Sequence, residues 1–155
     1  MYLTLKLLHI FGVVLFLGNI ITAVLWKSLA DRSNDARVIA YAMEGIIAAD
    51  RYFTVPGVGL ILVTGISLVI TSGYSFLGTT WVWQSLVLFA ISGIVFMGFL
   101  TPLQRRLRDV AVQGGRGGFD RVTYQRLSRQ WAIWGSLATL APLAALGLMV
   151  LKPTY

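Results

Sequence analysis

Four long apolar stretches constrain the fold of this chain more than any other feature of its sequence. Each has about 20 residues or more, and a helix of that length crosses the roughly 30 Å hydrocarbon core of a bilayer. Lipid offers no hydrogen bonds, so the backbone of each stretch must satisfy its own polar groups as a helix. We therefore predict an all-α integral membrane protein, a single domain over residues 1–155 built as a four-transmembrane-helix bundle. The predicted spans are residues 2–26, 52–72, 81–102 and 131–151.

The composition supports this class of protein. Hydrophobic residues make up 57% of the chain and charged residues only 12%, whereas a soluble domain carries about 25% charged residues. These charges are too few to cover a water-facing surface. Cysteine is absent from the sequence, which excludes disulfides, thiolate metal sites and a cysteine nucleophile.

A cleaved signal peptide is the alternative interpretation of the first stretch. Its apolar core is longer than that of a signal peptide, and no basic leader precedes it. Lys27 and Arg32 follow it in the manner of a stop-transfer flank. We expect a retained membrane helix.

The basic residues are distributed unevenly between the connections. Eleven of the thirteen lysines and arginines fall within residues 27–51 and 103–130, and residues 73–80 carry no charge. Because cytoplasmic loops accumulate Lys and Arg, we predict that the two basic segments are cytoplasmic and that the short 73–80 loop lies outside with both termini. The expected location is the cytoplasmic (inner) membrane of a bacterium. Membrane insertion explains the net charge of +7, so no nucleic-acid partner is expected.

The segment before the second span has the pattern of a helix. Arg37, Glu44 and Arg51 recur every seven residues and therefore share one stripe of a helix that begins near Asp35. We interpret the segment as a cytoplasmic helical extension of the second span, whose charged stripe faces water or lipid headgroups. A functional ion pair within the stripe is the less favoured alternative.

A glycine-rich run, residues 114–118, interrupts the second basic segment. It lacks the Gly-Lys-Ser/Thr ending of a phosphate-binding loop, and no strand precedes it. We predict a flexible linker. The arginines of the 103–130 loop are expected to contact anionic lipid headgroups, as basic segments beside a membrane do.

Polar side chains within the spans are few, and His9 is the only histidine of the chain. Lys6 lies near the outer surface, where its amine reaches the headgroups. His9 and Asn19 fall on one flank of the first helix and are expected to face the bundle, because intramembrane polar groups seek protein partners. All six acids belong to the opposite, cytoplasmic end. A catalytic triad or a carboxylate pair around His9 is therefore excluded, and we predict neither catalytic residues nor a metal-ion site.

Two roles are open for His9. A neutral imidazole in an apolar slot between helices is a suitable axial ligand for haem b, which would make this a haem-binding or redox-associated membrane protein. A six-coordinate iron would need His9 from a second protomer, and thus a homodimer. In the alternative role, which is the more frequent for a lone intramembrane histidine, the ring nitrogens meet Ser, Thr or backbone groups of a neighbouring helix.

Two other classes of function fit the sequence. Small residues such as Ala141 and Ala145, four apart, favour close helix packing. The bundle would then be non-enzymatic and bind membrane lipid, a quinone-like molecule or a partner membrane protein. A transporter or channel is less favoured, because ion pathways carry several polar groups at the midplane. The spans offer only Asn19 and scattered Ser or Thr.

Several motifs along nearly the whole chain resemble those of the uncharacterised bacterial membrane proteins catalogued as domain of unknown function 2269. The resemblance implies a multi-pass membrane protein. The motifs are the run from Tyr2 to Gly12 that contains Leu5-Lys6 and Leu8-His9-Ile10, the pair Gly18-Asn19, the run Arg51-Tyr52-Phe53-Thr54-Val55-Pro56-Gly57, and Pro102-Leu103-Gln104-Arg105-Arg106.

More distantly, the first two spans are similar to the CopD-like and HemJ-like group. In protoporphyrinogen oxidases of the HemJ type, a histidine of the first helix matches His9, and this similarity implies haem binding. That type also has a histidine and a lysine near the start of its third helix, where this chain has Trp83 and Ser85. Neither side chain ligates iron, so the similarity does not extend to protoporphyrinogen oxidation.

Overall fold

The computed structural model describes residues 1–153, and helices form nearly all of this part of the chain. Two rods are continuous α-helices, α1 (Tyr2–Ser33) and α6 (Arg121–Leu151). The two rods between them are composite. The second rod consists of α2 (Ala36–Ala49), the π-turn η1 (Asp50–Thr54) and α3 (Val55–Thr71). The third consists of α4 (Thr80–Val95), the π-turn η2 (Phe96–Leu100) and α5 (Thr101–Gly114).

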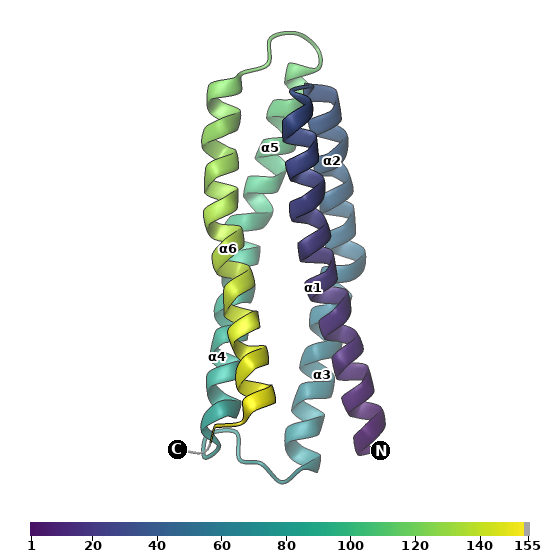
Figure 1. Cartoon of the computed structure of the whole chain (residues 1–155), viewed down its shortest axis with the longest axis vertical. Coiled ribbons are helices and arrows are strands. Elements are labelled where there is room, and N and C mark those ends of the chain that lie inside the picture. Colours follow the sequence, from purple (N-terminus) through teal and green to yellow (C-terminus); the bar gives the residue numbers. More distant parts are fainter. Residues whose placement is uncertain (154–155) are drawn as a thin grey trace.

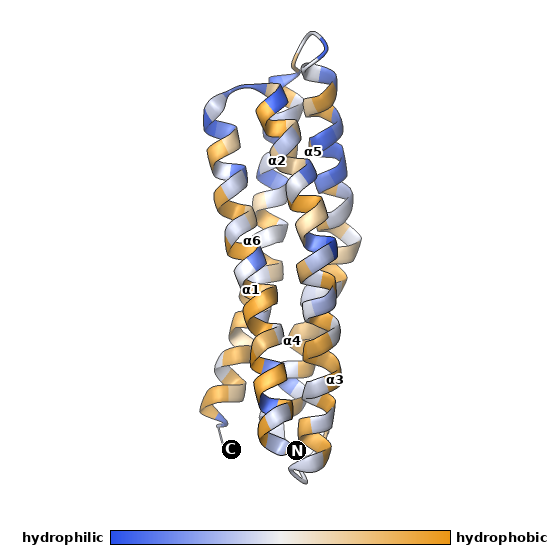
Figure 2. Cartoon of the chain, turned by 90° about the vertical axis from the view of Figure 1, so that its right-hand side faces the viewer, coloured by the Kyte–Doolittle hydropathy of each residue, from blue (hydrophilic) through white to orange (hydrophobic). Residues whose placement is uncertain are grey.

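The four rods lie side by side in an elongated bundle (Figure 1). α1 packs on α3, α4 packs on α6, and α2 packs on α5. The start of α1 and the end of α6 lie at the same end as the connection of residues 72–79 (Figure 1). The connections of residues 34–35 and 115–120 lie at the opposite end, which we call the arginine-rich end. Figure 2 shows that hydrophilic residues concentrate toward this end, while hydrophobic residues cover the other half, which we call the apolar half.

The rods are longer than a bilayer requires. Each contains 31 to 36 residues and is apolar enough over part of its length to cross a membrane. At 1.5 Å per residue the rods are about 50 Å long, against a hydrocarbon core of roughly 30 Å. The prediction of an all-α membrane bundle with four spanning helices is therefore confirmed, because each rod is apolar enough and longer than the hydrocarbon core.

The segment of residues 103–130 differs from the loop that the sequence led us to expect. α5 continues to Gly114 and α6 begins at Arg121, so the connection is a turn of residues 115–120. Within it, Gly117 and Gly118 have φ values of 138° and 83°, which glycine adopts more readily than other residues. The glycine-rich run therefore forms a short turn between helices.

Buried apolar residues explain why these arginine-rich segments are helical. Leu103, Leu107 and Ala111 recur every four residues along α5 and are buried in one cluster with Ile39 and Met43 of α2. This spacing places one apolar face of each helix toward the other and leaves the arginines outside. The prediction of a loop rested on the arginines and overlooked the apolar residues that lie between them.

Both composite rods have a π-turn followed by a proline. Pro56 is the second residue of α3, and Pro102 is the second residue of α5. In a regular helix, proline supplies no N–H, and its ring clashes with the carbonyl four residues earlier. The wider π-turn makes room for the ring. After η2, the Thr101 hydroxyl donates a hydrogen bond of 3.1 Å to the Phe96 carbonyl oxygen.

Small residues bring α4 and α6 together. Ser85 and Ser92 of α4 are buried and donate hydrogen bonds to the carbonyl oxygens of Ala145, at 3.4 Å, and Ala138, at 2.6 Å. Ala141 is buried between these two positions of α6. The small side chains let the serine hydroxyls reach the backbone of the neighbouring helix.

α1 and α3 also approach closely, at Gly12 and Gly57. A Cβ on Gly12 would lie 3.1 Å from Ile61 Cγ1 and 3.2 Å from the Gly57 carbonyl oxygen. A Cβ on Gly57 would lie 3.2 Å from the Gly12 carbonyl oxygen. The absence of a side chain at both positions allows the two backbones to touch.

We expect Gly12→Leu to lower the free energy of unfolding by about 1–3 kcal/mol, because the new side chain must enter space that α3 occupies. Gly18→Leu on the same helix is the matched control, since a Cβ there meets no atom within 4 Å. Chemical unfolding of the purified variants in detergent micelles measures the difference. Equal stability of the two variants would contradict the close contact.

Candidate functional site

His9 lies on α1 and forms a hydrogen bond with α3. Its Nδ1 atom is 3.0 Å from Thr64 Oγ1. The Thr64 hydroxyl donates its own proton to the Leu60 carbonyl oxygen at 2.5 Å, so Thr64 accepts the hydrogen bond from His9 Nδ1–H. This assignment fixes the tautomer and leaves the lone pair on His9 Nε2.

The surroundings of His9 fit a histidine held by hydrogen bonding between helices. A Cβ on Gly65 would lie 3.1 Å from His9 Cε1. The imidazole ring therefore occupies the space that this glycine leaves open. His9 Nε2 is the one nitrogen with a free lone pair at this site. The imidazole ring itself fills the space beside Gly65.

The other polar residues singled out in the sequence lie in different environments. Lys6 is exposed near the start of α1. Arg37, Glu44 and Arg51 are exposed as well. The two ion pairs found among the described residues do not include any of the three. That their stripe faces water or headgroups stays a prediction.

A second polar group, the Asp50 cluster, consists of Asn19, Asp50, Thr54 and Gln104. Asp50 Oδ1 accepts hydrogen bonds from Asn19 Nδ2 at 2.9 Å and from the Thr54 hydroxyl at 2.8 Å. Asp50 Oδ2 accepts a hydrogen bond from Gln104 Nε2 at 2.8 Å. Asn19 Nδ2 is also 2.9 Å from Thr54 Oγ1. The cluster thus connects α1, η1 and α5.

Sequence reasoning assigned Asp50 to a charged cytoplasmic segment and missed this cluster. Asp50 is only 8% exposed. The signal was its register, because Asp50 continues the buried face of α2 formed by Ile39, Met43 and Ile46. A carboxylate on the apolar face of an amphipathic helix has to find hydrogen-bond donors on another helix.

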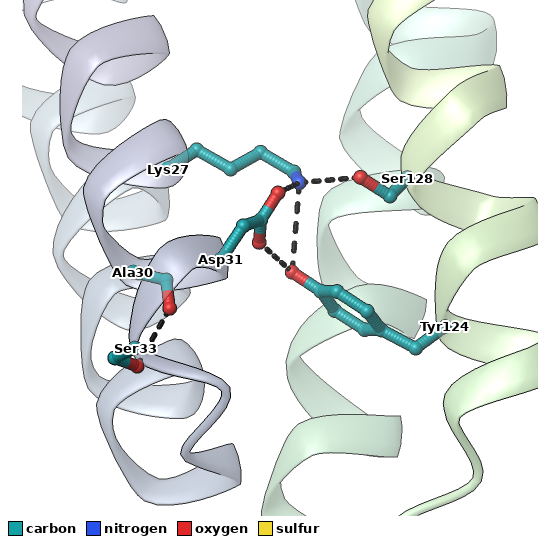
Figure 3. Close-up of polar contacts among 6 residues, drawn as sticks. All are labelled: Lys27, Ala30, Asp31, Ser33, Tyr124 and Ser128. Carbon is teal, nitrogen blue, oxygen red and sulfur yellow. Dashed lines mark hydrogen bonds and ion pairs between the residues drawn. The ribbon is translucent and has the colours of Figure 1, made fainter.

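A third polar group, the Lys27 cluster, lies between α1 and α6 and consists of Lys27, Asp31, Tyr124 and Ser128 (Figure 3). Lys27 Nζ lies 2.7 Å from Asp31 Oδ2 and donates to Ser128 Oγ at 2.7 Å. The Tyr124 hydroxyl donates to Asp31 Oδ1 at 2.5 Å. The ammonium group and the tyrosine therefore both hold the Asp31 carboxylate.

Lys27 is buried, with only 4% of its surface exposed. Its Nζ atom lies 5.4 Å from the centre of the Tyr124 ring and 5.3 Å from the centre of the Trp131 ring, within the range of cation–π attraction. The Trp131 Nε1 atom is buried without a hydrogen-bond partner. The sequence indicated Lys27 only as a stop-transfer flank, although its spacing of four from Asp31 is that of a helical ion pair.

Two cavities of about 380 Å³ each lie beside the Lys27 cluster, lined mainly by residues of α1 and α6. We call them together the α1–α6 groove. Asp31 and Ser128 line both cavities. Arg121 and Arg129 line the first cavity, and Arg32 lines the second. Cavities of this size accommodate small ligands, and guanidinium groups at the lining favour an anionic one.

We expect Lys27→Met to lower the free energy of unfolding by about 1–3 kcal/mol, because it leaves Asp31 without its cation. This loss of stability is smaller than for a fully buried ion pair, because the Asp31 side chain is partly exposed. The double variant Lys27→Met/Asp31→Asn should recover part of this loss. Asp109→Asn, which breaks the more exposed Arg108–Asp109 pair, should cost less than about 1 kcal/mol. Additive effects in a double-mutant cycle of Lys27 and Asp31 would contradict the coupling.

Comparison with known proteins agrees with this architecture. Residues 3–153 match the family model described as "Predicted integral membrane protein (DUF2269)". No curated protein and no solved structure matches the chain. The distant similarity to the CopD-like and HemJ-like group is not confirmed by these comparisons. The match covers nearly the entire chain, and this protein therefore belongs to the DUF2269 family of predicted integral membrane proteins.

Proposed function

We propose that this protein is a membrane bundle that binds an anionic lipid, with the lipid phosphate in the α1–α6 groove. The observation that carries the proposal is the pair of adjoining cavities lined by Arg32, Arg121 and Arg129. Arginine is well suited to phosphate because its guanidinium presents two parallel N–H donors. Ser128 accepts a hydrogen bond from Lys27, so its own hydroxyl proton is available to a phosphate oxygen.

The Lys27 cluster gives the groove its shape and leaves the arginines to provide its charge. Asp31 neutralises Lys27 at 2.7 Å, and the remaining cations at the groove are the arginines. Because Lys27 reaches from α1 to Ser128 of α6, it fixes the spacing of these helices. A rigid spacing lowers the cost of ordering the site when a ligand binds.

The proposed orientation brings this groove to the level of lipid headgroups. The positive-inside rule assigns the arginine-rich end to the cytoplasm and both termini to the outside of a bacterial inner membrane. Residues 2–26 and 131–151 then span the bilayer, and Trp26 and Trp131 lie at its inner interface, where tryptophan is enriched. A lipid of the inner leaflet would present its phosphate to the arginines, and its acyl chains would follow the apolar half.

We expect added phosphatidylglycerol to raise the Tm of the purified protein in detergent and to be retained in native mass spectra, whereas phosphatidylcholine should do neither. Each arginine near an anionic headgroup contributes about 1 kcal/mol, so Arg121→Gln/Arg129→Gln should bind phosphatidylglycerol roughly tenfold to thirtyfold more weakly.

Arg105→Gln/Arg106→Gln is the matched control, because these two exposed arginines of α5 do not line the groove. It removes the same charge from the same end of the bundle and should bind phosphatidylglycerol like the wild type. Equal losses in the two double variants would show that only overall charge matters and would refute the groove as the site. A Tm increase of the same size with inorganic phosphate alone would indicate a phosphate site that does not require a lipid.

We propose haem b binding at His9 as a second candidate function. It is supported by the hydrogen bond of His9 Nδ1–H to Thr64, because a metal-binding histidine commonly donates its other ring N–H in this way. His9 Nε2 would ligate the haem iron, together with His9 of a second copy of the chain. A haem bound there would add one-electron redox chemistry to the bundle.

An absorption spectrum tests the second candidate. Protein purified under mild conditions from cells with ample haem should show a Soret band, and His9→Ala should lose it. Asn19→Ala, which changes a polar residue of the same helix, should retain the band. A colourless wild-type preparation would rule out haem and leave His9 with its hydrogen bond between α1 and α3.

A further inference from the structure

The Asp50 cluster brings oxygen-bearing side chains from three helices into direct contact. Asn19 Nδ2, Asp50 Oδ1 and Thr54 Oγ1 form a triangle whose sides measure 2.9, 2.8 and 2.9 Å. Gln104 contacts the other carboxylate oxygen of Asp50 at 2.8 Å. None of these residues lines the α1–α6 groove, so the cluster is a separate site with its own chemistry.

The charge of this site is not balanced by a side chain. Asp50 is buried, and the two ion pairs among the described residues, Lys27–Asp31 and Arg108–Asp109, do not involve it. Neutral donors solvate the carboxylate through hydrogen bonds but leave its negative charge in place. A buried carboxylate in this state attracts either a proton or a cation.

We propose that the Asp50 cluster is a binding site for a small monovalent cation, with Na⁺ as the fitting ion. A side-chain amide offers its oxygen in place of its nitrogen when it rotates by half a turn. After this rotation, the Asn19 amide oxygen would lie beside Asp50 Oδ1 and Thr54 Oγ1, and the Gln104 amide oxygen would lie beside Asp50 Oδ2. Hard cations are bound by oxygen ligands of these kinds.

The ligand set favours a single positive charge. One carboxylate neutralises one monovalent ion, and the remaining ligands would be the Thr54 hydroxyl and the two amide oxygens that replace Asn19 Nδ2 and Gln104 Nε2 after the rotation. Ca²⁺ is usually held by six to eight oxygens with several carboxylates, and Mg²⁺ keeps several of its waters. A compact site with one acid suits neither divalent ion.

The backbone places this site where a bound ion would affect the whole bundle. Asp50 and Thr54 are the first and last residues of η1, and π-turns within helices occur frequently at functional sites. The cluster joins α1 and η1 to α5, which belongs to the third rod. An ion shared by these helices would stabilise the folded protein by mass action.

Purified protein in choline chloride is titrated with NaCl at constant ionic strength, and Tm and the binding of radioactive ²²Na⁺ are measured. We expect the Tm to rise saturably with NaCl and ²²Na⁺ to bind at a single site per chain. In Asp50→Asn, the affinity for Na⁺ should fall by at least about tenfold, because the variant lacks the only formal negative charge of the site.

Asp109→Asn is the control, since it removes an exposed carboxylate from α5, the helix that carries Gln104. It should keep the wild-type response to Na⁺. If Asp50→Asn does not fold, Gln104→Met provides the test, because it removes one oxygen and keeps the carboxylate, and its affinity for Na⁺ should also fall.

Three results would overturn the proposal. The first is a wild-type Tm that is the same in NaCl and in choline chloride, and the second is a Na⁺ response that persists unchanged in Asp50→Asn. The third is an infrared band of a protonated carboxylic acid at neutral pH in NaCl that disappears in Asp50→Asn. Such a band would show that a proton, and not a metal cation, neutralises the site.

Discussion

The packing of α2 against α5 is the contact on which the arrangement of the other helices depends. In the apolar half, α1 packs on α3 and α4 packs on α6, and lipid tails are as apolar as the side chains, so no hydrophobic force drives the two pairs together. The proposed orientation places the arginine-rich end in water, where burial of apolar residues such as Ile39, Met43 and Leu107 would be favourable. In that orientation this end would follow the packing rules of a soluble protein and keep the two pairs together.

Polar clusters add specificity to this hydrophobic contact. The Lys27 cluster connects α1 to α6, and the Asp50 cluster connects α1 and η1 to α5. Hydrogen bonds between buried polar groups require particular partners, so they select one register among the helices where apolar packing alone would tolerate several. The Lys27 cluster adjoins the arginines of the proposed lipid site, and the Asp50 cluster itself forms the proposed cation site. Residues that select the helix register therefore also form the proposed cation site, and they adjoin the proposed lipid site.

The sequence predicted the four spans, because twenty apolar residues in a row have few alternatives to a membrane helix. It did not predict the polar clusters, for a physical reason. The sequence indicates Lys27 as a stop-transfer flank and places Asp50 in a cytoplasmic segment, whereas the contacts of both residues depend on which helices are neighbours. The partners of Lys27 include Tyr124 and Ser128, about 100 residues further along the chain, and a hydropathy pattern contains no information about such pairs. The register of Asp50 on the apolar face of α2 was the one local signal.

The π-turns account for the way the composite rods change partners along their length. A π-turn adds one residue to the helix, which rotates everything beyond it by about 100° relative to a continuous α-helix. Accordingly, α2 packs mainly on α5 before η1 while α3 packs on α1 after it, and α4 packs on α6 before η2 while α5 packs mainly on α2 after it. Asp50 lies at the change of partner, within hydrogen-bond distance of both Asn19 on α1 and Gln104 on α5. A regular helix through this point would keep one face toward one neighbour. The π-turn η1 before Pro56 therefore allows the single carboxylate of Asp50 to reach both α1 and α5.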